Sequence, residues 1–145
     1  MPALLKNILN KLKTEKSVVE LQGLSGSSKA LVLSILSQIQ EQPAEKNIPL
    51  VVVCESFDVA EVLLNDLYYF LGKEGVHFFP FWDVLPYDNF SPHKALVAQR
   101  FQTLDALLSE EIRVLITTPN GLMQRFLPRV TFQKNTISLC TESAC

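Results

Sequence analysis

Residues 18–36 read VVELQGLSGSSKALVLSIL, and this stretch decides the fold. A short β-prone run at residues 17–22 stops at Gly23, and a turn-rich segment follows it. Residues 29–40 then carry apolar side chains at helical spacing. The stretch therefore predicts a strand, a loop and a helix in succession.

The remainder of the chain repeats this alternation. The run PLVVVC at residues 49–54 is continuously apolar, which predicts a strand covered on both faces. Asp58 is the expected N-cap of a helix over residues 59–71, and Gly72 the residue that ends it. Further strands are expected at residues 76–79, 113–117 and 136–140, and further helices from Ser91-Pro92 to about residue 109 and over residues 119–126. Strands that alternate with helices predict an α/β fold, with a mostly parallel sheet between two layers of helices.

Composition limits the classes of function. The chain has 145 residues, 48% of them hydrophobic and 19% charged, which is typical of one soluble globular domain spanning residues 1–145. Its net charge of −2 argues against a stand-alone nucleic-acid-binding module. Residues 1–15 predict an amphipathic helix without the apolar block of a signal peptide, so a cytoplasmic location is expected. The final residues, TESAC, provide no helix to cover the sheet and suggest a fragment of a longer protein.

The turn-rich segment resembles a phosphate-binding P-loop, which reads G-x-x-x-x-G-K-[ST] between a strand and a helix. Gly23 and Lys29 stand in their places, but Ser28 replaces the second glycine and Ala30 the hydroxyl residue. Serine disfavours the positive φ that glycine allows there, and alanine cannot ligate Mg²⁺. The residues of this vestigial loop are Gly23, Gly26, Ser27, Ser28, Lys29 and Ala30.

Three interpretations of this loop remain. It is a plain polar turn with an exposed lysine, a vestigial phosphate loop, or an active nucleotide site with an atypical sequence. No acidic pair follows a strand to serve as a Walker B motif, since the expected strands end at Cys54-Glu55 and Thr117-Thr118. We therefore expect no catalytic residue and no metal ligand here, although helix N-termini attract anions and a phosphate could still bind amides of residues 26–29.

A second motif suggests a family. Residues 85–93 read LPYDNFSPH and follow Phe81-Trp82-Asp83, while Arg100 and the stretch TTPNGLMQRFLP at residues 117–128 come later. This combination resembles the N-terminal module of bacterial transcription-repair coupling factors (Mfd), which is itself similar to the first domain of UvrB. The signature residues are Leu85, Pro86, Tyr87, Asp88, Phe90, Ser91, Pro92 and His93.

The resemblance implies a P-loop NTPase-like topology of the kind found in helicases and in UvrB domain 1. It also implies a full-length protein that hydrolyses ATP with Mg²⁺ in a separate downstream motor, translocates on DNA, displaces stalled RNA polymerase and recruits UvrA. This chain would then be a non-catalytic scaffold or docking domain acting in nucleotide excision repair, without a cofactor of its own. The alternatives are an active P-loop nucleotidase or kinase, and a flavodoxin-like domain that binds a small ligand at the carboxyl ends of its strands.

Several single residues have a functional and a structural interpretation. Trp82, Tyr87 and Phe90 could stack on nucleic-acid bases, but basic residues are not interleaved with them, so we expect packing. His93 could act as a base, yet a position at the start of a helix is the simpler expectation. Cys54 ends an apolar run and is expected to be a buried, unreactive thiol.

Overall fold

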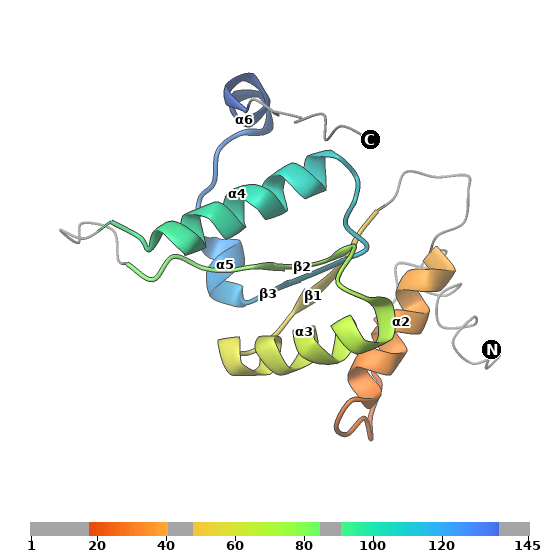
Figure 1. Ribbon diagram of the computed structural model, residues 1–145. Helices are drawn as coiled ribbons and strands as arrows, with labels where there is room; N and C mark the ends of the chain where they lie inside the picture. The colour runs from red at the N-terminus through yellow and green to blue at the C-terminus, as the bar shows by residue number, and fades with distance from the viewer. Residues whose placement is uncertain (1–17, 41–47, 85–90, 137–145) are drawn as a thin grey trace, which may run out of the picture.

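A computed structural model describes residues 18–40, 48–84 and 91–136. These residues form a small sheet and helices of differing length (Figure 1). In chain order the elements are α2 (Ser28–Gln40), β1 (Leu50–Val53), α3 (Phe57–Leu71), β2 (Val76–Phe79), α4 (Lys94–Leu108), β3 (Val114–Thr117), α5 (Pro119–Met123) and α6 (Arg129–Asn135). Within these ranges no helix is long and apolar enough to span a membrane.

The three strands form one parallel sheet in the order β1-β3-β2. Val114 of β3 pairs with Leu50 of β1 on one side and with Val76 of β2 on the other. Helix α3 connects β1 to β2, and α4 connects β2 to β3. The predicted α/β fold with a parallel sheet is confirmed, because each helix returns the chain to the end of the sheet from which the next strand starts.

Two cores lie on opposite faces of the sheet. Helix α3, with α2 beside it, covers the face that presents Phe78 and Ile116, and α4 covers the face that presents Phe79 and Leu115 (Figure 1). The pleat of the strands accounts for this division, since successive side chains point to opposite faces. Burial of these residues, together with Leu67 of α3 and Ile112 before β3, provides the main apolar stabilisation.

The prediction of a strand at residues 17–22 is wrong for the residues that the structure describes, because residues 18–22 form neither a strand nor a helix. Val18 is 98% exposed and Leu21 is also exposed. A run of β-prone residues is stable as a strand only when a neighbouring strand accepts its hydrogen bonds and a helix covers it. Neither is found here, so local β propensity does not produce a strand.

Strand β1 also differs from its expected environment. Its run of apolar residues predicted burial on both faces, but Val51 and Val53 are 49% and 50% exposed. Both lie at the edge of the sheet on the face that α4 covers at β2 and β3. The apolar run therefore predicted the strand correctly and its cover wrongly.

The predicted helix boundaries need two corrections here. The N-cap of α3 is Ser56, whose hydroxyl accepts a hydrogen bond from the Val59 amide at 3.3 Å, and Asp58 lies inside the first turn. Helix α4 begins at Lys94, so Pro92 precedes the helix instead of lying in its first turn. Gly72 ends α3 with a φ of 80°, as expected.

At the carboxyl end of the described chain, α5 ends at Met123 instead of the expected residue 126. Helix α6 was not predicted, and its Phe132 ring stacks on Phe101 of α4 with 5.7 Å between the centroids. Thr136 is not in a strand, and the rest of the strand expected at residues 136–140 lies outside the described residues. The expected amphipathic helix at residues 1–15 lies outside them too.

Candidate functional site

The loop before α2 closes as a tight turn. The Ser28 amide donates to the Ser25 carbonyl at 3.2 Å, and the Ser28 hydroxyl donates to the same oxygen at 2.6 Å. Gly26 and Gly23 adopt positive φ values of 52° and 79°, whereas Ser28 is already helical. A phosphate cradle needs several unbonded amides that point to one centre. Here the Ser28 amide is already bonded within the turn, so fewer donors remain for an anion.

Charged side chains near the loop oppose a nucleotide. A hollow of about 550 Å³ separates the loop from α3, and Asp58 and Asp66 of α3 line it opposite Lys29. Lys29 is the single cation among its described lining residues. The two carboxylates outnumber the one ammonium, so the hollow has a net negative charge. It therefore repels a triphosphate, because like charges interact unfavourably.

Side chains that depart from the P-loop and Walker B patterns have structural roles. Ala30 is fully buried in the core between α2 and α3, so its side chain packs and does not face the loop. Thr118, at the end of β3, accepts a hydrogen bond from the Gly121 amide at 3.4 Å and caps α5. In the described ranges no group of three or more His, Cys, Asp or Glu side chains is placed to hold a metal ion.

Cys54, at the end of β1, is 6% exposed, as expected for a buried thiol. Burial raises the pKa of the Cys54 thiol, nearby Lys29 lowers it, and Glu55 raises it further. Burial is the largest of these effects, so the thiolate needed for nucleophilic attack is scarce at neutral pH.

We expect iodoacetamide at pH 7.5 to alkylate Cys54 at least about ten-fold more slowly in the folded chain than in urea, because both burial and the raised pKa lower its reactivity. Peptide mass spectrometry after timed quenching measures the rate at each cysteine. A Cys54 that reacts as fast in the folded chain as in urea would contradict this expectation.

The signature motif is described only in part. Residues 85–90, which include Leu85, Pro86, Tyr87, Asp88 and Phe90, lie outside the described residues. Ser91 and Pro92 lead into α4, and the His93 Nδ1 atom accepts a hydrogen bond from the Ala95 amide at 3.4 Å. The expected position of His93 at the start of a helix is confirmed, and its ring is exposed.

Three residues from stretches that carry the family resemblance, Trp82, Arg100 and Gln124, meet at one place in the described chain. The Arg100 side chain is 2% exposed, and its guanidinium carbon lies 4.2 Å from the centre of the Phe79 ring and 4.4 Å from that of Trp82. Its Nη1 atom donates to the Pro80 carbonyl and, at 3.3 Å, to Gln124 Oε1. We call Phe79, Pro80, Trp82, Arg100 and Gln124 the arginine cluster.

Gln124 closes the arginine cluster from a third segment. Its Oε1 atom accepts from the Trp82 amide at 2.6 Å, and its Nε2 atom donates to the Trp82 carbonyl at 3.5 Å. The backbone of Trp82 is thus held at both its amide and its carbonyl, and its ring packs on Arg100, in agreement with the packing interpretation. Burial lowers the pKa of Arg100, but a guanidinium stays protonated at neutral pH. The cluster therefore places a buried positive charge against two aromatic rings.

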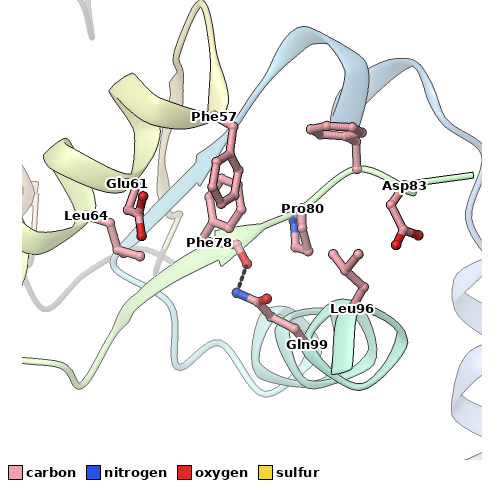
Figure 2. Close-up of a pocket in the computed structure, with 9 residues that line it drawn as sticks. Phe57, Glu61, Leu64, Phe78, Pro80, Asp83, Leu96 and Gln99 are labelled. Atoms are coloured by element: carbon pink, nitrogen blue, oxygen red, sulfur yellow. Dashed lines mark hydrogen bonds between the residues drawn. The ribbon is translucent and has the colours of Figure 1, made fainter. Parts of the chain in front are cut away.

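A separate cavity opens at the carboxyl end of β2, between α3 and α4 (Figure 2). It has a volume of about 520 Å³ and an apolar lining that includes Phe57, Phe78 and Leu96. The Phe57 and Phe78 rings meet edge to face with 5.6 Å between centroids. Glu61 and Asp83 lie at opposite sides of the cavity (Figure 2). This is the place where open α/β sheets bind ligands.

Reasoning from the sequence missed the burial of Arg100. Phe101 and Leu104 belong to the apolar residues of α4 and would be expected on its buried face, whereas the buried residues of the helix are Arg100, Thr103 and Ala106. Phe101 is partly exposed instead. The available signal was the aromatic sequence FPFW at residues 79–82, because buried aromatic rings beside a helix can accommodate one guanidinium.

Comparison with known proteins agrees with the resemblance. No protein-family model matches the chain. It is 31% identical over 102 residues to the transcription-repair-coupling factor of Haemophilus influenzae, which covers 70% of this chain and 9% of that protein. The Escherichia coli transcription-repair-coupling factor is 47% identical over 47 residues, 32% of this chain and 4% of that protein. That of Myxococcus xanthus is 32% identical over 117 residues, 76% of this chain and 9% of that protein.

The aligned segments cover less than a tenth of each of these relatives. They extend over most of this chain in two of the three cases. Distant partial similarity of this kind relates the chain to the transcription-repair-coupling factors.

Proposed function

We propose that the chain is a non-catalytic scaffold and docking module, equivalent to the N-terminal UvrB-like part of a transcription-repair coupling factor. The observation that carries the proposal is the arginine cluster, where three sequence segments that resemble the family meet around one buried guanidinium. The similarity to transcription-repair-coupling factors supports the same assignment. Such a module contributes shape and binding surface to a repair protein, and no chemistry of its own.

The full-length protein would act in the cytoplasm during nucleotide excision repair. We infer that it displaces stalled RNA polymerase from DNA and recruits UvrA, using ATP and Mg²⁺ in a downstream motor. The degenerate loop would be inherited from a P-loop NTPase-like ancestor. Its position supports this, because Lys29 lines a hollow with Cys54 and Glu55 at the carboxyl end of β1, the edge of the sheet where a P-loop lysine belongs.

Titration with ATP tests the absence of catalysis. Because of the tight turn and the carboxylates of Asp58 and Asp66, we expect calorimetry to show binding no tighter than about 1 mM, with or without Mg²⁺. Lys29→Ala should change nothing in this measurement, and Lys73→Ala is the matched control at an exposed lysine that does not line the hollow. Magnesium-dependent micromolar binding, with turnover lost in Lys29→Ala and kept in Lys73→Ala, would establish an active nucleotidase instead.

The cavity of Figure 2 favours a second candidate, a domain that binds a small apolar ligand. Its volume lies in the range of small-molecule sites, about 300–1,000 Å³. Native mass spectrometry of the purified chain distinguishes the two candidates. A retained mass that disappears on denaturation would favour the ligand-binding domain, and a chain of bare sequence mass would favour the docking module.

A further inference from the structure

A second cavity lies beside the arginine cluster. It has a volume of about 320 Å³ and is lined by Trp82, by Arg100 and Phe101 of α4, and by Arg125 and Phe126 from the segment between α5 and α6. We call it the arginine cavity. Its walls combine aromatic rings with two guanidinium groups, an arrangement suited to an apolar group that carries a negative charge.

Arg100, which lines this cavity, carries an unsatisfied donor. The guanidinium lies against the Phe79 and Trp82 rings, and Nη1 is bonded to Pro80 and Gln124. The Nη2 atom is buried and has no hydrogen-bond partner. Buried polar groups in native proteins are nearly always bonded, so an unpaired one indicates a missing acceptor. Because the N–H bonds of a guanidinium lie in its plane, that acceptor has to approach in this plane.

Arg125 adds a second positive charge at the mouth of the cavity. Its side chain is exposed, and no carboxylate of the described residues pairs with it or with Arg100. Several large apolar side chains close to Arg125 in the sequence are exposed to solvent. These are Leu122, Met123, Phe126, Leu127 and Val130. An uncovered apolar surface beside unpaired cations is typical of a protein-binding site.

We propose that the arginine cavity binds a segment of another protein in which a carboxylate stands next to a large apolar side chain. The carboxylate would accept in-plane hydrogen bonds from the two arginines, and the apolar side chain would lie against Phe101 and Phe126. A nucleic-acid strand fits less well, because it requires a longer track of cations than these two and the chain carries a net charge of −2. The proposal rests on the docking role above and names its partner chemistry.

Trp82 provides a direct measurement, since it is the single tryptophan of the chain and lines the cavity. The probe is the peptide N-acetyl-Leu-Asp-Phe-Glu-amide, and its control is N-acetyl-Leu-Asn-Phe-Gln-amide, which has nearly the same shape without charge. Titration at about 0.15 M salt should change Trp82 fluorescence with the acidic peptide, at about ten-fold lower concentration than with the amide peptide, because charge-assisted hydrogen bonds are lost in the control.

A substitution at the exposed residue Arg125 separates an effect on peptide binding from an effect on folding. Arg125→Gln should weaken the acidic peptide roughly three- to five-fold, the range of a partly exposed ion pair, and should leave the amide peptide unchanged. Arg129→Gln is the matched control, because Arg129 is exposed nearby on α6 but does not line the cavity. Unchanged affinity in Arg129→Gln, with the loss in Arg125→Gln, supports the proposal.

Four results would overturn it. These are equal binding of the two peptides, an equal effect of Arg125→Gln and Arg129→Gln, tighter binding of oligo(dT) than of the acidic peptide, and self-association of the chain that Phe126→Ser abolishes. The last two would assign the surface to nucleic acid or to a second copy. The ATP titration is independent of these outcomes, since the degenerate loop and the arginine cavity share no lining residue.

Discussion

Replacing Arg100 with alanine should lower the free energy of unfolding by about 3 kcal/mol, which is a large fraction of the stability of a small domain. The substitution removes two hydrogen bonds from a charged donor and leaves the Pro80 carbonyl unsatisfied, while Gln124 Oε1 keeps its bond from the Trp82 amide. It also removes the guanidinium that packs on the Phe79 and Trp82 rings and leaves a cavity there. Loss of the unpaired Nη2 donor offsets part of this cost, so the net effect is smaller than the sum of the separate losses.

Urea unfolding followed by circular dichroism measures this change. Trp82 fluorescence gives a second readout, because a tryptophan released from the arginine cluster should emit at longer wavelength even in the folded chain. Arg100→Lys keeps the charge without the planar fork and should restore little of the stability. Arg129→Ala, at an exposed position, should stay within about 0.5 kcal/mol of the parent chain. Equal stability of Arg100→Ala and Arg129→Ala would contradict the structural role of the cluster.

The strands show which parts of the fold local sequence patterns can predict. The apolar runs at residues 50–53, 76–79 and 114–117 predicted β1, β2 and β3 to within a residue or so. Residues 18–22 have a similar local pattern and form no strand. The difference is not local, because a strand depends on a neighbouring strand and a covering helix contributed by distant segments.

The candidate sites likewise combine features that the sequence shows with features that only the folded chain shows. The departures of Ser28 and Ala30 from the P-loop pattern are visible in the sequence, since a motif is a local property. The carboxylates of Asp58 and Asp66 that face the loop come from α3, a separate segment of the chain, and only the folded chain brings them there. Arg100 is the clearest case, because a charged residue is expected at the surface and its burial depends on rings and carbonyls from two other segments.

Gly121→Ala should destabilise the chain by about 2 kcal/mol through overpacking. A Cβ atom at Gly121 would lie 2.5 Å from Thr117 Oγ1 and 3.2 Å from the Phe79 carbonyl oxygen, two groups that hydrogen-bond to each other at 2.9 Å. Helix α5 must move away to relieve these contacts, and Gln124 directly follows it. The substitution should therefore also loosen the contact of Gln124 with Arg100, which Trp82 fluorescence reports.

A double-mutant cycle identifies the cause of this loss. In a Thr117→Ala background the closest contact is absent, so Gly121→Ala should cost about 1 kcal/mol less than in the parent chain. Gly72→Ala is the control for backbone strain, because Gly72 has a φ of 80° and a Cβ added there would meet nothing within 4 Å, whereas Gly121 lacks a positive φ. If Gly121→Ala costs the same in both backgrounds, the Thr117 contact does not set the position of α5. Coupling of the expected size would instead show that close packing of Gly121 on β2 and β3 holds Gln124 against Arg100.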